Sequence, residues 1–197
     1  MNNQKTSRIV PAMKRTTLFL ALLVVSAVPV LAQSSELGIL VGGSRRFVEN
    51  DAQPVDGGID DSFSFSNTSV ELYYKQPIDP NTSLRLKLGQ MDGSVAFPTG
   101  TNQRTDVKGQ IQHVSGLVGY EFDEPYGSTG FFGGLGMYRQ SASGFDSETA
   151  WGLQVGLNGD FPLTRRYGVI VEASYHWVHF ELAPRYLTLS GGLRVSF

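Results

Sequence analysis

The feature that most constrains this 197-residue chain is a period of two in its apolar residues, which recurs in eight segments separated by turn-forming residues. In residues 83–91, for example, leucine at every second position alternates with Arg85, Lys87 and Gly89. This alternation predicts β-strands with one apolar and one polar face. No stretch after residue 32 has enough consecutive apolar residues to cross a membrane as a helix. The segments are residues 36–47, 62–75, 83–91, 107–122, 130–140, 149–161, 167–178 and 186–197.

The first 32 residues have the composition of an export signal. Four basic residues come first, an apolar run extends from Leu18 to Leu31, and Val30-Leu31-Ala32 offers the small residues that signal peptidase requires. We expect cleavage after Ala32, which leaves residues 33–197 as one domain. Met13 begins a complete signal by itself, so either Met1 or Met13 can be the true start. The basic residues are Lys5, Arg8, Lys14 and Arg15.

The charge of the mature chain bears on its partners. The whole chain has 16 Lys and Arg and 18 Asp and Glu, and the signal holds four of the basic residues and none of the acidic ones. The mature chain is therefore left with twelve basic residues against 18 acidic ones, a net charge of −6. Such a chain has no electrostatic basis for binding nucleic acid. The absence of cysteine excludes disulfides and thiolate metal sites.

Two architectures share the period of two. A soluble barrel or sandwich buries its apolar face, whereas a membrane barrel turns that face to lipid and its charged face to the lumen. The height of the aromatic residues favours the membrane barrel, because it sorts them into two girdles at the interfaces. One predicted rim carries Tyr74, Tyr120, Phe122, Phe131, Phe161, Tyr167 and Phe197, and the other carries Trp151, Tyr175 and Trp177.

The lengths of the connections fit an N-terminus in the periplasm. The predicted inner links, residues 76–82, 123–129 and 162–166, are short. Two predicted outer loops, residues 48–61 and 92–106, are longer. Short inner turns and long outer loops are typical of outer-membrane barrels.

The closing segment, residues 187–197, alternates apolar residues and ends in Phe197. With its eight segments and two girdles, the chain after the signal resembles the small OmpX- and OmpA-type outer-membrane barrels. The resemblance implies an eight-stranded antiparallel up-and-down transmembrane β-barrel with both termini in the periplasm. It also implies that Phe197 belongs to the signal by which the outer-membrane assembly machinery recognises such proteins. It implies no single activity, because this fold hosts structural proteins, adhesins and lipid-modifying enzymes.

The predicted lumen face carries six charged residues. An eight-stranded barrel has an interior about wide enough for its own side chains. Charges there must pair or be hydrated, because an isolated buried charge is costly. A paired network that fills the lumen is therefore expected, and a narrow gated pore is the alternative, since glycines on the same face leave space. The six are Glu71, Arg85, Lys87, Glu121, Glu172 and Arg194.

One set of residues has the types needed for nucleophilic catalysis, namely Glu172, Ser174 and His176 on one face of a strand. Residues two apart on a strand lie almost 7 Å apart, since each rises about 3.3 Å. A Ser–His hydrogen bond needs roughly 3 Å. The set would also face the lumen. Lipid A deacylase barrels are the enzyme analogy, but their His-x-Ser order is absent, since this chain reads Ser174-Tyr-His176.

Metal binding has little support in the sequence. The first predicted outer loop has five acidic residues but no calcium-loop spacing, so a solvated acidic loop is expected. The three histidines, His113, His176 and His179, are not spaced as a zinc site, and the last two would point to opposite faces. We expect no cofactor. The loop acids are Glu49, Asp51, Asp56, Asp60 and Asp61.

These observations predict a non-enzymatic outer-membrane protein whose barrel anchors surface loops that serve adhesion or whose fold supports envelope integrity. We expect it to be a monomer. Its expected partners are outer-membrane lipid, lipopolysaccharide and the assembly machinery. Three other hypotheses stay open at this point: a narrow gated pore, a lipid-modifying hydrolase and a soluble periplasmic barrel.

Overall fold

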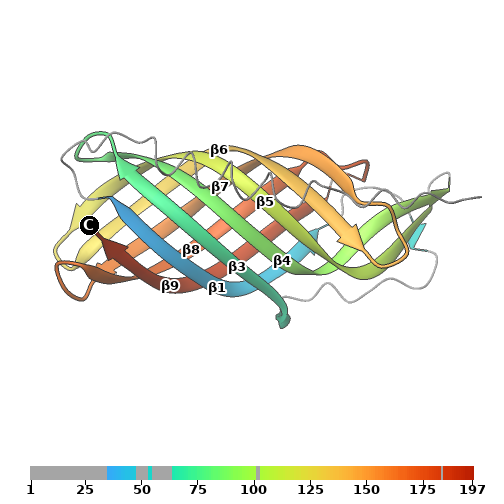
Figure 1. Ribbon diagram of the computed structural model, residues 1–197, viewed down its shortest axis with the longest axis horizontal. Coiled ribbons are helices and arrows are strands. Elements are labelled where there is room, and N and C mark those ends of the chain that lie inside the picture. Colours follow the sequence, from blue (N-terminus) through green and yellow to red (C-terminus); the bar gives the residue numbers. More distant parts are fainter. Residues whose placement is uncertain (1–34, 48–52, 55–63, 101–102, 183) are drawn as a thin grey trace, which may run out of the picture. The chain divides into compact units, whose positions relative to one another are not determined.

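The computed structural model describes residues 35–47, 53–54, 64–100, 103–182 and 184–197. The expected signal segment and the five acids of the first outer loop lie outside these residues. Within the described residues there are eight long strands and one two-residue strand (Figure 1). The strands are β1 Glu36–Phe47, β2 Gln53–Pro54, β3 Ser64–Pro77, β4 Thr82–Gly100, β5 Gln103–Glu124, β6 Gly127–Ala142, β7 Glu148–Pro162, β8 Tyr167–Val178 and β9 Arg185–Ser196.

The eight long strands of the described chain close into a ring in which each pairs antiparallel with the next one along the sequence. The ring closes where β1 pairs with β9, from Glu36 opposite Ser196 to Phe47 opposite Arg185. Closure leaves no unpaired backbone edge around the ring, as a hydrocarbon environment requires. The short β2 adds a parallel bridge to the end of β5. The predicted eight-stranded up-and-down barrel is confirmed.

The barrel is inverted relative to a soluble protein. Its outer face exposes large apolar side chains such as Leu157, which is 64% exposed, Leu193 and Val171. Its inner face buries charged side chains, including Lys87 and Glu172. Because exposed apolar surface of this extent is stable only against lipid, the barrel is a transmembrane one and the soluble-barrel hypothesis is wrong. In the part of the chain that the structure describes, no helix is long and apolar enough to span a membrane.

The two ends of the barrel differ. At one, called the turn end, residues 78–81, 125–126 and 163–166 connect neighbouring strands, and the C-terminus lies there (Figure 1). These turns are shorter than the predicted links because the strands run further. In the first turn, Oδ1 of Asp79 accepts hydrogen bonds from the backbone N–H groups of Asn81 and Thr82, at 2.9 and 2.7 Å. These bonds, that of Asn81 first, lower the pKa of the Asp79 carboxyl.

The opposite end, called the loop end, contains a feature that the sequence pattern did not predict. Residues 92–106 were expected to be a loop, but residues 92–100 and 103–106 continue β4 and β5 as a two-stranded hairpin. The hairpin separates from β3 after Ser69 pairs with Met91, and from β6 after Gly109 pairs with Ala142. Residues 92–100 and 103–108 are called the ribbon below. The expectation failed because residues 94–97 are all buried, so no alternation marks them as a strand.

The ribbon packs over the mouth of the barrel. Nη2 of Arg46, on the inner face of β1, lies 3.0 Å from Oδ1 of Asp106 in the ribbon. The ring of Phe97 stacks on that of Phe145, in the β6–β7 connection, with centroids 4.6 Å apart. Nε2 of Gln140 on β6 donates to the carbonyl oxygen of Ala96 at 3.4 Å. These contacts hold the ribbon against three other parts of the chain.

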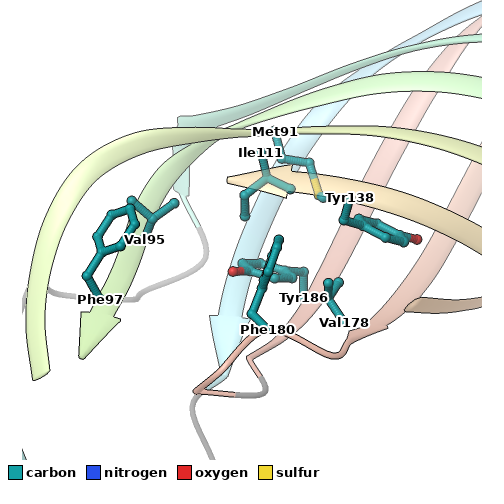
Figure 2. Close-up of a cluster of buried hydrophobic side chains, with 8 residues drawn as sticks. All are labelled: Met91, Val95, Phe97, Ile111, Tyr138, Val178, Phe180 and Tyr186. Carbon is teal, nitrogen blue, oxygen red and sulfur yellow. The ribbon is translucent and has the colours of Figure 1, made fainter. Parts of the chain in front are cut away.

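The ribbon and the strands below it share a cluster of buried apolar side chains, called the mouth cluster (Figure 2). Its members come from the loop-end halves of β4, β5, β6, β8 and β9 and from the β8–β9 connection. An apolar layer inside a membrane barrel was not expected from a lumen face that reads as polar. The members are Met91, Val95, Phe97, Ile111, Tyr138, Val178, Phe180 and Tyr186.

Truncation of Phe97 tests this packing. Phe97 is 6% exposed, and Phe97→Ala removes its stack on Phe145. We expect the free energy of local opening of the ribbon to fall by about 3–5 kcal/mol, the usual cost of deleting a buried phenyl ring. Trypsin should then cut after Arg104 and Lys108 much faster in the folded, detergent-solubilised protein.

The matched control is Leu157→Ala, which shortens an outer-face side chain far from the ribbon. It should leave the rate of cleavage after Arg104 and Lys108 unchanged. Equal cleavage of wild type and Phe97→Ala would contradict the packing described above.

Candidate functional site

The inner face of the barrel carries a network of charged side chains, which is the candidate functional site. The structure places all six predicted lumen residues there and adds Glu36, Lys75 and Asp160. Each added residue lies within a predicted segment and continues the inward parity of its strand, one step beyond the inward residues that were named. Following the period to the ends of those segments would have found them.

The centre of the network is Lys87 on β4, which is 0% exposed. Its Nζ donates to Oε2 of Glu71 at 2.6 Å and to Oε1 of Glu172. In the described ring, three strands separate β4 from β8 in either direction, so Lys87 and Glu172 come from opposite walls. The ammonium group also lies 5.1 Å from the ring centroid of Phe132. The contact of Lys87 with Glu71 and Glu172, called the cross-brace below, passes through the middle of the lumen.

Arg85, one inward position closer to the turn end, extends the cross-brace. Its Nη2 donates to Oε1 of Glu121 at 2.5 Å and to Oδ1 of Asn158 at 3.0 Å. Its Nη1 lies 3.9 Å from Oε2 of Glu172. The guanidinium also lies over the ring of Phe132, at 5.2 Å. Arg85 thereby links β4 to β5, β7 and β8.

Ion pairs continue to the turn end. Nζ of Lys75 lies 2.9 Å from Oε2 of Glu36 and 3.1 Å from Oε2 of Glu121. Nε of Arg194 lies 2.5 Å from Oδ2 of Asp160 and 3.8 Å from Oε1 of Glu36. Every cation named in this network therefore has a carboxylate beside it. Buried pairs of this kind specify one arrangement more than they add stability, because desolvation offsets much of the attraction.

A layer of histidine and tyrosine lies between the charges and the rest of the mouth cluster, of which Tyr138 is itself a member. The hydroxyl of Tyr138 lies 3.0 Å from Nδ1 of His176, and Oγ1 of Thr188 lies 3.5 Å from Nε2 of the same ring. The ring of His113 stacks on Tyr138, with centroids 5.3 Å apart. Nε2 of His113 lies 3.7 Å from Oε1 of Glu71, which joins this layer to the network.

The residue types of a catalytic triad do not form one on β8. Oγ of Ser174 donates to Oε1 of Glu172 at 2.6 Å, while His176 is engaged by Tyr138 and Thr188. A serine–histidine contact occurs elsewhere, between Oγ of Ser115 and Nδ1 of His113 at 3.3 Å. Ser115 and Ser174 are both 1% exposed inside the barrel. Neither serine is accessible to a lipid on the outer face.

Metal ligands do not converge in the described part of the chain, where no group of three His, Asp or Glu side chains is placed to hold an ion. His176 lies inside the barrel and His179 outside it, as their spacing predicted. The ring of His179 stacks on Trp151, with centroids 5.1 Å apart.

The predicted girdle residues all lie on the outer face or at its ends. At the turn end Tyr120, Phe122 and Phe131 form one cluster, with ring centroids 5.1 to 6.2 Å apart. The hydroxyl of Tyr74 donates to Oε1 of Gln76 at 2.7 Å. The remaining turn-end aromatics, exposed on the same rim, are Phe161, Tyr167 and Phe197. At the loop end, Trp151 and Trp177 are exposed and Tyr175 is half-buried.

Phe197 lies beside the point where the ring closes. Its backbone N–H donates to the carbonyl oxygen of Ser35 at 3.0 Å, one residue before β1 begins. Its side chain is 70% exposed. The last residue of the chain is thus joined to the first residue of the described barrel.

Several solved structures share this fold. Neisserial surface protein A is 15% identical over 83% of this chain and 97% of its own, with a TM-score of 0.63. The attachment invasion locus protein Ail of Yersinia pestis, in complex with the heparin analogue sucrose octasulfate, is 16% identical over 83% of this chain and 98% of its own, with a TM-score of 0.51. The N-terminal β-barrel domain of Pseudomonas aeruginosa OprF is 11% identical over 84% of this chain and all of its own, with a TM-score of 0.52.

These identities establish a shared fold and nothing about activity. Comparison with curated protein sequences gives no match. The family described as outer membrane protein beta-barrel domain matches residues 18–197, which include every strand described above. The chain therefore belongs to the outer membrane protein beta-barrel domain family.

Proposed function

We propose that this protein is a non-enzymatic outer-membrane scaffold, in which a closed barrel holds the ribbon and loops at the cell surface for contact with other surfaces. The observation that carries the proposal is the closure of the lumen at two levels. The cross-brace spans it at the centre, and the mouth cluster fills it at the loop end. A barrel closed in this way serves as an anchor.

The alternative of a narrow gated pore has less support. An ion would have to pass Lys87, which lies between carboxylates from two walls, and then an apolar layer of eight residues. Opening this path would leave buried charges without partners, which is costly. The lipid-modifying hydrolase also has little support, because both candidate serines face the interior.

The length of two strands supports a contact role at the surface. A membrane-spanning strand needs only about 9–11 residues. β4 has 19 residues and β5 has 22, and both extend past their other neighbours as the ribbon. Ail of Yersinia pestis, one of the solved structures that share this fold, is an attachment invasion locus protein, which is consistent with surface contact by a barrel of this size.

The same proposal covers the export of the protein and its orientation in the outer membrane. Residues 1–32 are a signal cleaved after Ala32, and the turn end faces the periplasm. The exposed terminal Phe197 and its strand β9 provide the sequence that the assembly machinery recognises, and the barrel functions as a monomer among outer-membrane lipid and lipopolysaccharide. The short turns at one end and the ribbon at the other support this orientation.

Lys87→Met tests the closed lumen. The substitution keeps a similar volume and leaves Glu71 and Glu172 buried without their shared cation. We expect the free energy of unfolding, measured by urea titration in lipid vesicles, to fall by about 3–5 kcal/mol. Adding Glu71→Gln and Glu172→Gln should restore much of it, because the unpaired charges are then removed.

Lys108→Met, which removes an exposed lysine of the ribbon, is the matched control and should change the stability little. In planar bilayers the wild-type protein should show no single-channel steps. Steps of reproducible size would refute a closed lumen and favour the gated pore.

Processing of the precursor can be measured directly. The intact mass of protein purified from outer membranes should correspond to a chain that starts at Gln33, whether translation begins at Met1 or Met13. Ala32→Arg should block cleavage, because signal peptidase requires a small residue there. A mature N-terminus at any other residue would show that the signal has been placed wrongly.

Adhesion tests the role of the ribbon. Replacing residues 98–104 by Asn-Gly shortens the ribbon with a two-residue hairpin turn and keeps Phe97. Cells displaying the wild-type protein should bind a cultured epithelial monolayer several-fold better than cells with an empty vector, and the shortened variant should lose that gain. Survival in detergent, which reports envelope integrity, should not change.

The control replaces residues 125–126 by Asn-Gly, the same turn at the opposite end of the barrel. It should adhere like the wild type. If the shortened ribbon adheres fully, surface contact through the ribbon is wrong. If only detergent survival falls, the protein supports envelope integrity instead.

A further inference from the structure

Three aromatic rings at the loop end each have a nitrogen-bearing side chain against them on the outer face. The guanidinium of Arg45 lies 5.1 Å from the ring centroid of Phe47, and that of Arg185 lies 5.5 Å from that of Trp177. The imidazole of His179 stacks on Trp151 at 5.1 Å, with the planes 21° apart. These six residues are called the rim patch below: Arg45, Phe47, Trp151, Trp177, His179 and Arg185.

The strand register makes the rim patch continuous. Arg185 on β9 pairs with Trp177 on β8 and with Phe47 on β1, so the three lie in one row across adjacent strands. The backbone N–H of His179 donates to the carbonyl oxygen of Trp151 at 2.9 Å, which adds the end of β7 to the row. Since neighbouring strands lie about 4.8 Å apart, the patch covers roughly 15 Å of the rim.

The outer face of β4 and β5 differs where these strands reach the loop end. It carries amides that bond to neighbours on their own strand. Nε2 of Gln112 donates to Oε1 of Gln110 at 3.0 Å, and Nε2 of Gln90 donates to Oδ1 of Asp92 at 2.9 Å. The combination of arginine and tryptophan is therefore concentrated on the β7–β8–β9–β1 side of the described rim.

The chemistry of the rim patch indicates its partner. An arginine on the lipid face of a barrel is costly near the bilayer midplane and nearly neutral at the interface, so Arg45 and Arg185 mark the height of the headgroups. Tryptophan at the same height is the usual interface anchor. Guanidinium binds phosphate oxygens through paired hydrogen bonds, and stacking on an aromatic ring holds it in one orientation.

We propose that the rim patch binds the phosphorylated headgroup of a lipid in the leaflet at the loop end, with Arg45 and Arg185 as the phosphate ligands. Trp177 and Phe47 hold the two guanidinium groups, and the exposed apolar side chains of β8, β9 and β1 contact the acyl chains. The proposal uses the membrane placement of the scaffold and does not depend on what the ribbon contacts.

The test uses intrinsic fluorescence, because the chain has two tryptophans and both belong to the rim patch. Diphosphorylated lipid A is titrated into folded protein in dodecyl maltoside micelles, which contain no phosphate. We expect a saturable change in tryptophan emission. Arg45→Gln with Arg185→Gln should weaken the apparent affinity roughly thirtyfold, at the usual value of a basic residue near anionic lipid.

The matched control is Lys108→Gln with Arg139→Gln, which removes the same charge from exposed residues of β5 and β6. It should bind lipid A like the wild type. Arg45→Lys with Arg185→Lys should bind with intermediate affinity, since it keeps the charge and loses the planar fork. A heat-dependent shift in electrophoretic mobility verifies that each variant is folded.

The proposal is overturned if the Arg45→Gln, Arg185→Gln protein binds like the wild type, or if the control loses as much affinity. Equal binding of lipid A stripped of its phosphates would also overturn it, as would inorganic phosphate binding as tightly as lipid A. The adhesion assay on intact cells separates this result from the scaffold proposal, because it compares ribbon variants in which the rim patch is unchanged.

Discussion

The contact of Lys87 with Glu71 and Glu172 links opposite walls of a closed ring, and the rest of the lumen is arranged around it. One cation with two carboxylates leaves one negative charge without a cation. Towards the turn end, Arg85 approaches Glu172 and also pairs with Glu121, and towards the loop end Nε2 of His113 lies 3.7 Å from Oε1 of Glu71. Because each cation meets its carboxylates only when the strands are paired in this register, the network specifies the register of the strands that carry it.

The outer face depends on a different constraint, the interface between hydrocarbon and water. Apolar side chains cover the middle of the barrel, exposed aromatic rings lie towards both ends of its outer face, and the arginines of the rim patch lie at the loop-end rim. The inner network and the outer apolar and aromatic residues lie on alternate residues of the same strands. A shift of one residue in β4, for example, would bury its leucines in the network and expose Lys87 to lipid.

The period of two predicted the strands, because strands between lipid and a polar lumen must alternate at every residue, and the height of the aromatic residues was needed to favour the membrane barrel over a soluble one. It also identified Glu71, Arg85 and Lys87 as interior residues, since parity alone decides that. It failed for the ribbon, where residues 94–97 are buried on both faces and alternation disappears. The mouth cluster and the partners of each charge depend on which strands lie opposite, and on how side chains such as Phe180 pack, which a linear pattern does not contain.

The hydrogen bond from Phe197 to Ser35 has a consequence for biogenesis. The first strand finds its second partner only in β9, so a partial product of the ribosome that lacks β9 cannot complete the cylinder. Until then β1 has one edge without its native neighbour. An array of strands that lacks β9 has two exposed edges that can pair with other chains, so a truncation that removes β9 leaves the cylinder open and prone to aggregation.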